Sequence, residues 1–224
     1  MIQARFRFRA VEGQEVRDRH SDVIRNLAFV TWLWEILPKD VQISLSGESA
    51  SCSLNPYLKA NIKGAISYAA RYSQGMSDKA IFDDVLTLNL EENAIHYAQF
   101  SGCIFEDIVK AFVAYRATII LDLDLDIDDY EDIVELAQKT GKDIDGRDTV
   151  YRFNPINYFD DQLCHRAFGF GAEEVVTRLD GEIERAVIQE GGALIIATTD
   201  LVDRDNLYAL HNHIASLLGI EATN

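Results

Sequence analysis

The alternation of apolar and polar side chains predicts a strand at the start of the chain, and helical spacing predicts a helix at its end. Between positions 4 and 10, Ala and Phe alternate with Arg, which is the period of two expected of a strand with one buried face. Near the other end, leucines and isoleucines recur every three or four residues after Asp203. This spacing predicts a final helix that begins near Asp203 and is capped by Gly219.

The same patterns predict the elements in between. A segment over 16–37 is apolar on nearly every side, as a buried helix is, and Asn55-Pro56 has the N-cap and first-turn residues of another helix. Residues 172–187 fit a helix, although Asp180-Gly181 could also form a hairpin turn; we favour the helix because its apolar spacing continues through the glycine. The predicted helices cover 16–37, 55–75, 105–112, 128–139 and 203–219, and the predicted strands cover 4–10, 85–90, 94–100, 118–127 and 193–197.

These elements predict an α+β fold. Strands and helices mix without the regular alternation of a parallel sheet, so we expect a mixed or antiparallel sheet with helices packed on it. No stretch rich in Pro, Gly or Ser divides the chain. Residues 1–224 are therefore expected to form a single domain, with 141–159 as a long surface connection.

Composition narrows the classes of function. The 224 residues carry a formal net charge of -16, and 48% of them are hydrophobic, which is ordinary for a globular protein. The acidic balance argues against nucleic acid or an anionic membrane surface as partner, because both attract a basic footprint. No apolar stretch suits a transmembrane helix or a signal peptide. The three cysteines are far apart, so a reducing, cytoplasmic location is expected.

Short catalytic motifs are missing from the sequence. No dinucleotide or phosphate loop, serine-hydrolase motif or zinc-protease motif occurs. His211 and His213 lie two apart on a predicted helix and point to different sides, so we expect one packed and one exposed histidine. The adjacent Cys164 and His165 lack a catalytic context. We therefore expect a protein that is not an enzyme and that needs no cofactor and no metal.

The most distinctive segment is acidic. From Leu121 to Glu135 there are 8 acids and no base, and residues 121–128 alternate between Leu or Ile and Asp. On a strand, this alternation buries the apolar side chains and exposes Asp122, Asp124 and Asp126 on the other face, about 7 Å apart. The acids that follow suit the N-terminus of a helix.

Three interpretations of the acidic run stay open: a solvated face, a metal site, or a surface for a basic protein. Asp124, Asp126 and Asp128 imitate the spacing of a calcium loop, but Asp129 stands where that loop requires glycine. Three carboxylates in a row on one rigid strand repel one another. A cationic partner would relieve this repulsion.

Arg5, Arg7 and Arg9 form a basic row on the first predicted strand. They could bind phosphate, but pairing with the acid-rich remainder of the chain, or protection of an edge strand, explains them better. Trp32 and Trp34 present a choice between core packing and an interface anchor. Core packing is favoured.

The whole pattern resembles a known class of protein. Small acidic α+β chains without catalytic motifs are typical of bacterial immunity proteins, which neutralise toxins of polymorphic and type VI secretion systems. The order of features resembles immunity family fifty-two, with the strand Arg5-Phe6-Arg7-Phe8-Arg9, a helix with Trp32-Leu33-Trp34, a late strand over 192–198 and a terminal helix. The resemblance implies a cognate toxin, often a nuclease, as the partner that this chain binds and blocks in the producing cell.

An acidic inhibitor gains a fast encounter with a basic groove, but tight blocking needs an apolar or aromatic anchor inside the polar rim. Aromatic residues lie on or just after the acidic helix. The predicted partner-binding residues are Asp122, Asp124, Asp126, Asp129, Tyr130, Asp132, Tyr151 and Phe153, with Tyr158 and Phe159 as further anchor candidates. The alternatives are a metal-dependent hydrolase that uses Asp122, Asp124 and Asp126, and a structural subunit of a larger assembly.

Overall fold

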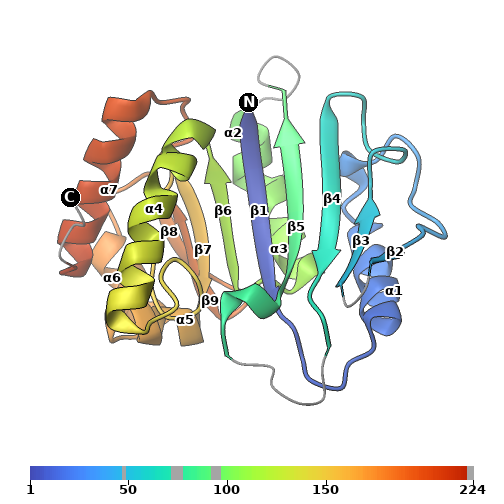
Figure 1. Cartoon of the computed structure of the whole chain (residues 1–224). Coiled ribbons are helices and arrows are strands. Elements are labelled where there is room, and N and C mark those ends of the chain that lie inside the picture. The colour runs from blue at the N-terminus through green and yellow to red at the C-terminus, as the bar shows by residue number, and fades with distance from the viewer. Residues whose placement is uncertain (47–48, 72–77, 92–96, 221–224) are drawn as a thin grey trace. The chain divides into compact units, whose positions relative to one another are not determined.

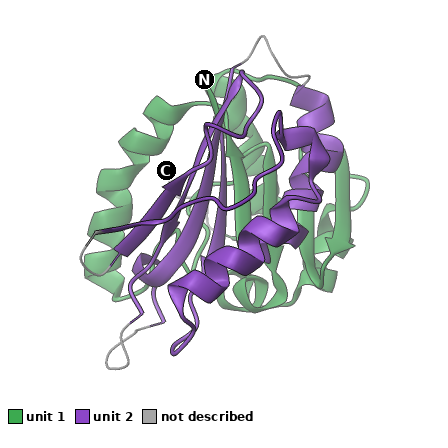
Figure 2. Ribbon diagram, turned by 90° about the vertical axis from the view of Figure 1, so that its right-hand side faces the viewer, with its two compact units in different colours: residues 1–2, 115–224 green, residues 3–114 purple. Residues whose placement is uncertain are grey.

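The computed structural model of the chain describes residues 1–46, 49–71, 78–91 and 97–220 (Figure 1). Contacts divide the chain into two compact units, one of residues 3–114 and one of residues 1–2 with 115–224 (Figure 2). Each unit combines strands with helices, and the pairings given below are antiparallel. The expected α+β class with an antiparallel sheet is therefore confirmed, whereas the single domain stays a prediction.

The unit of residues 3–114 has the strand order β2-β3-β4-β5-β1, with antiparallel pairing from β2 to β5. Helices α1 and α3 lie on one face of these strands (Figure 1), where the rings of Phe6 and Phe105 are 5.1 Å apart between centroids. The elements are β1 (Ile2–Arg9), α1 (Val16–Leu27), η1 (Thr31–Leu33), β2 (Ser44–Ser46), β3 (Ser49–Ser53), β4 (Ile62–Tyr68), η2 (Ala80–Phe82), β5 (Asp83–Leu90), α2 (Tyr97–Gln99), the π-helical turn η3 (Phe100–Ile104) and α3 (Phe105–Phe112).

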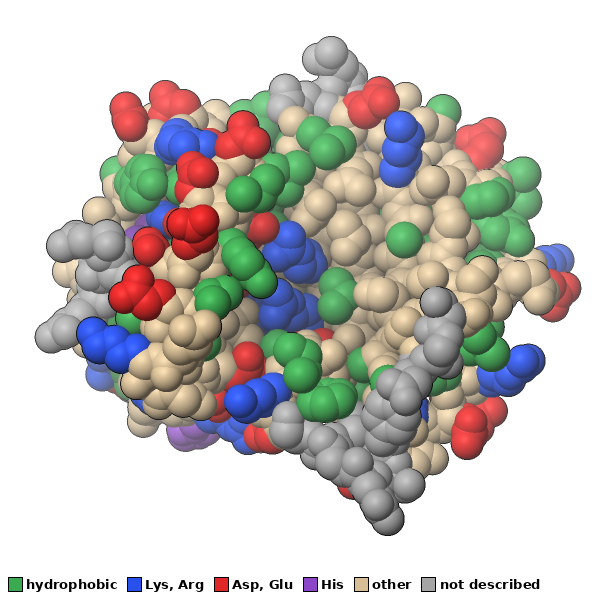
Figure 3. All heavy atoms as spheres, in the orientation of Figure 1, with side chains coloured by type: hydrophobic (Ala, Val, Ile, Leu, Met, Phe, Trp, Pro, Cys, Tyr) green, Lys and Arg blue, Asp and Glu red, His purple; other side chains and the backbone are tan. Residues whose placement is uncertain are grey.

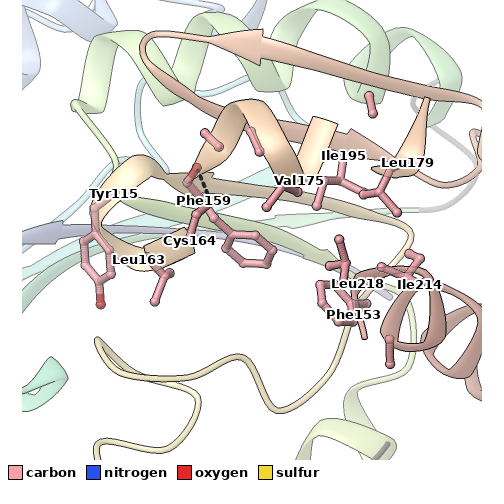
Figure 4. Packing of buried hydrophobic residues seen from close by; sticks show 14 residues of the cluster. Tyr115, Phe153, Phe159, Leu163, Cys164, Val175, Leu179, Ile195, Ile214 and Leu218 are labelled. Atoms are coloured by element: carbon pink, nitrogen blue, oxygen red, sulfur yellow. Dashed lines mark hydrogen bonds between the residues drawn. The ribbon is translucent and has the colours of Figure 1, made fainter. Parts of the chain in front are cut away.

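The unit that contains residues 115–224 has the strand order β6-β7-β9-β8, and these neighbours pair antiparallel. Its elements are β6 (Arg116–Ile120), α4 (Leu123–Thr140), β7 (Ile156–Asp160), α5 (Asp161–Phe168), α6 (Ala172–Leu179), β8 (Arg185–Gln189), β9 (Gly192–Ile196) and α7 (Arg204–Leu218). Side chains from β7, β8, β9, α5, α6 and α7 belong to one buried cluster (Figure 4). Glu190 and Gly191 both have positive φ angles, as a tight turn between β8 and β9 requires.

The helix expected over 16–37 is shorter than predicted. Helix α1 ends at Leu27, and Trp34 Nε1 donates to the Leu27 carbonyl at 2.8 Å. Trp34 is buried in the core as expected, and Trp32 is half-buried. The apolar residues after Leu27 therefore do not continue a buried helix, and one of them, Phe29, is 81% exposed.

The helix expected over 55–75 is wrong in its middle, where strand β4 forms instead, and its last residues, 72–75, lie outside the described part of the chain. Ile62 and Ile66 are four residues apart, a spacing that fits one face of a helix and one face of a strand equally well. Both side chains are buried in β4. The expected strand over 85–90 is confirmed as β5; its expected hairpin partner over 94–100 begins among residues outside those described and is helical from position 97.

The later elements follow the sequence more closely. The helix over 105–112, the strand over 193–197 and the final helix are confirmed as α3, β9 and α7. The helix favoured over 172–187 is confirmed only as far as Leu179, where α6 ends. A turn follows at Asp180-Gly181 and β8 begins at Arg185, so the expectation that the helix continues through the glycine is wrong. The connection expected over 141–159 includes the start of β7. Among the described residues, no helix has the length and apolar content to cross a membrane.

Candidate functional site

The acidic run forms a helix rather than a strand. Asp122 is the N-cap of α4, and its side chain accepts a hydrogen bond from the Leu125 backbone N–H at 2.9 Å. Asp124 and Asp126 lie in the first turn, where the helix dipole favours negative charge. The strand predicted over 118–127 is therefore confirmed only up to Ile120, where β6 ends, and is wrong for the residues that follow. The expected row of aspartates on one strand face is wrong as well. Capping and the dipole favour the helix, whereas a strand would align three carboxylates that repel one another.

Two arginines hold α4 against the rest of its unit. Arg204 of α7 donates from Nε to Asp122 at 2.7 Å and from Nη1 to Asp128 at 3.0 Å. Arg152 donates to both carboxylate oxygens of Asp129. The hydrogen bonds from Arg204 hold the pKa of Asp122 at about 2. Asp122 and Asp129 therefore have internal partners, and Asp129 is also buried. The expectation that both carboxylates are free to meet a partner is wrong.

The aromatic anchors expected in the connection over 141–159 are buried. Tyr151 is 7% exposed and donates its hydroxyl to Asp132 at 3.2 Å. Phe153 is 1% exposed and belongs to the cluster in Figure 4. Tyr158 and Phe159 lie in β7 and are buried as well. The expected exposure of all four is wrong because this connection contributes a strand and core side chains to its unit.

An acidic and apolar face of α4 remains exposed. Ile127 is 67% exposed and Tyr130 is 65% exposed. Asp124 and Glu131 flank Ile127 at helical spacings of three and four, and Glu135 lies one turn beyond Glu131. Figure 3 shows acidic and hydrophobic side chains gathered over α4. We call these five residues the α4 face.

The carboxylates of the α4 face differ from Asp122 and Asp129 in their ion pairs. Within the part of the chain that the structure describes, no Lys or Arg forms an ion pair with Asp124, Glu131 or Glu135. The sequence analysis missed Ile127 because strand alternation assigned it to the buried side. On a helix, Ile127 is about 200° around the axis from the buried Leu125, which places it on the outside.

The histidines of α7 and Cys164 of α5 are catalytic candidates by residue type. His211 is buried and His213 is exposed, as expected; burial first, and the charge of Arg152 second, lower the pKa of His211 to about 4. Burial raises the pKa of the Cys164 thiol to about 12, which disfavours a nucleophilic thiolate.

The aspartates proposed for a hydrolase are not gathered at one point. Asp124 is about 200° around the helix axis from Asp126, and Asp122 binds Arg204. In the described ranges, no group of three or more His, Cys, Asp or Glu side chains is arranged to hold a metal ion.

The chain matches no protein-family model and no curated protein. Among solved structures, it is similar to a type VI secretion system (T6SS) protein of Pseudomonas aeruginosa, with a TM-score of 0.50 and 12% sequence identity. The similarity covers 97% of this chain and 72% of that chain. At this identity the likeness concerns the fold.

Proposed function

We propose that this chain is an immunity protein, which binds a cognate bacterial toxin and neutralises it by stoichiometric contact. The observation that carries the proposal is the α4 face, where carboxylates that pair with no Lys or Arg of the described residues lie beside exposed apolar side chains. The partner that fits this face is a basic protein, such as a nuclease-type toxin. The contact blocks the toxin and requires no chemistry from this chain.

Electrostatics supports the choice of partner. A toxin that acts on nucleic acid presents a basic groove, because its substrate carries phosphates. The chain has a formal net charge of -16, and opposite charges on two proteins speed their diffusional encounter. The α4 face adds a local concentration of negative charge to this general attraction.

The structural neighbour supports a role connected with type VI secretion. It is named as a T6SS protein, and cells that deliver toxins through such a system need protection from them. We propose that the present chain gives such protection.

The proposal is tested by asking whether a gene beside this one encodes a toxin and by co-expressing that toxin with this chain. We expect growth to be restored, and purification of an inactivated form of that toxin should yield a complex of fixed stoichiometry by light scattering. Protection at far fewer than one molecule of this chain per toxin would indicate an enzymatic antidote and contradict the proposal.

A matched pair of charge variants tests the role of the α4 face. The first combines Asp124→Asn, Glu131→Gln and Glu135→Gln; the control combines Glu12→Gln, Glu15→Gln and Asp18→Asn, which are exposed in the other unit. Both remove three negative charges. We expect association of the first variant to slow by about one order of magnitude at low salt, with a smaller difference near 1 M salt. Equal rates for the two variants would assign the steering to net charge alone.

A further inference from the structure

We infer that Ile127 and Tyr130 are the central anchor of the α4 face and insert into an apolar pocket of the partner, inside a rim of lysine or arginine. The inference rests on the proposed function and identifies the part of the surface that controls how long the complex lasts. The apolar contact is expected to set the dissociation rate, whereas the charge variants described above are expected to change the association rate.

The two side chains lie close together on the exposed side of α4. They are three residues apart on α4, a spacing at which helical side chains are neighbours, and the half-buried Val134 continues the stripe one turn later. Both are about two-thirds exposed. Within its unit, α4 buries Leu125 and Asp129, so the core does not use Ile127 or Tyr130.

The surrounding charges specify the partner. Asp124 and Glu131 stand on either side of Ile127 and have no cation of their own among the described residues. If an acidic or neutral surface covered them, these carboxylates would lose water without gaining a counter-charge, which is costly. A basic rim supplies the counter-charge, and an apolar pocket within it receives the two anchors. This arrangement matches the hot-spot anatomy of tight interfaces.

Helix α4 is ordered before any partner arrives. Asp122 caps its first turn, and the Gly141 N–H donates to the Ala137 carbonyl at 2.9 Å at its other end. Arg204 of α7 binds the start of the helix, and Arg152, in the connection between α4 and β7, binds Asp129. Binding therefore needs little ordering of the backbone, and a preorganised surface loses less entropy on association.

A second exposed aromatic residue, Phe29, serves as a control for the anchor residues of α4. Phe29 is 81% exposed and lines a hollow of about 400 Å³ between α1 and α3. Asp107 and Lys110 line the same hollow, so its charges are mixed and favour no basic partner. Phe29 is thus a matched control, since it is large, aromatic and exposed but lacks the acidic surround.

The experiment measures dissociation of the purified, catalytically inactivated toxin from Ile127→Ala, Tyr130→Ala and Phe29→Ala variants. Removing a hot-spot side chain costs at least about 2 kcal/mol, which corresponds to about 30-fold. We expect Ile127→Ala and Tyr130→Ala each to dissociate about 30-fold faster with association rates within about threefold of the original. Tyr130→Phe, which keeps the ring, should dissociate normally, and so should Phe29→Ala. Thermal unfolding midpoints of all variants should match the original, because the altered side chains are exposed.

The outcomes separate this inference from the proposed function. If the unmodified chain forms a complex but both α4 variants dissociate at its rate, or if Phe29→Ala has the large effect, the anchor assignment is overturned and the immunity function stands. If the unmodified chain forms no complex with the toxin, both are overturned.

Discussion

Acid should destabilise this protein through one buried histidine. His211 is 4% exposed, and its Nδ1 accepts a hydrogen bond from the Phe153 N–H at 3.1 Å. That bond requires an unprotonated Nδ1, and burial together with the charge of Arg152 lowers the pKa of His211 from 6.5 to about 4. The unfolded chain therefore binds a proton near pH 6.5 that the folded chain binds only near pH 4. The stabilisation is complete above pH 6.5 and is lost as the pH falls towards 4. One pKa unit corresponds to about 1.4 kcal/mol, so the total loss is about 3 kcal/mol.

Urea unfolding between pH 4 and pH 7 measures this loss. The variant His211→Asn keeps an acceptor for the Phe153 N–H but cannot titrate, whereas His213→Asn alters an exposed histidine on the same helix. We expect His211→Asn to be less stable at pH 7, because it leaves a void, and to show a pH dependence smaller by about 3 kcal/mol than the original. His213→Asn should follow the original. An unchanged pH dependence in His211→Asn would refute the argument.

Three further predictions concern stability and are read from thermal or urea unfolding. Asp122→Ala removes both the α4 N-cap and the ion pair with Arg204 and should lower the free energy of unfolding by about 1–2 kcal/mol; an unchanged free energy of unfolding would contradict this. Leu125→Asp buries a charge at a site that is 2% exposed and should prevent folding, because such burial costs several kcal/mol. Leu123→Asp alters a half-buried position and should fold, whereas equal effects would restore the strand interpretation. Val113 has a φ of 56°, so Val113→Gly should raise the free energy of unfolding by about 0.5–1 kcal/mol; a lower unfolding midpoint would contradict this reasoning.

The sequence predicts elements well where local signals agree. Asp203, the leucine spacing and Gly219 all indicate the same final helix, and α7 begins and ends at those caps. The acidic run is the opposite case. Its alternation of Leu and Asp indicates a strand as far as Ile127, and only the acids from Asp128 onward indicate a helix N-terminus. The helix begins earlier, at Leu123, with Asp122 as its N-cap.

The candidate site was only partly predictable for a different reason. The acidic segment and Tyr130 were identified from the sequence, but the exposure of Ile127 depends on where α4 begins. The partners of the acids also lie far along the chain, since Arg204 is 82 positions after Asp122. A single sequence contains no signal that joins such distant charges, so it could not separate acids with internal partners from acids that remain available.

The distribution of cysteines permits selective labelling of the natural chain. Cys52 and Cys164 are buried, and burial raises their thiol pKa values to about 11 and about 12, whereas Cys103 is exposed on η3. Alkylating dyes react with accessible thiolates, so a maleimide fluorophore should attach at Cys103 without any cysteine replacement. The dye would lie in the unit of residues 3–114, which does not contain α4. Its polarisation would rise as a partner adds mass to the molecule, which provides a direct optical readout of complex formation.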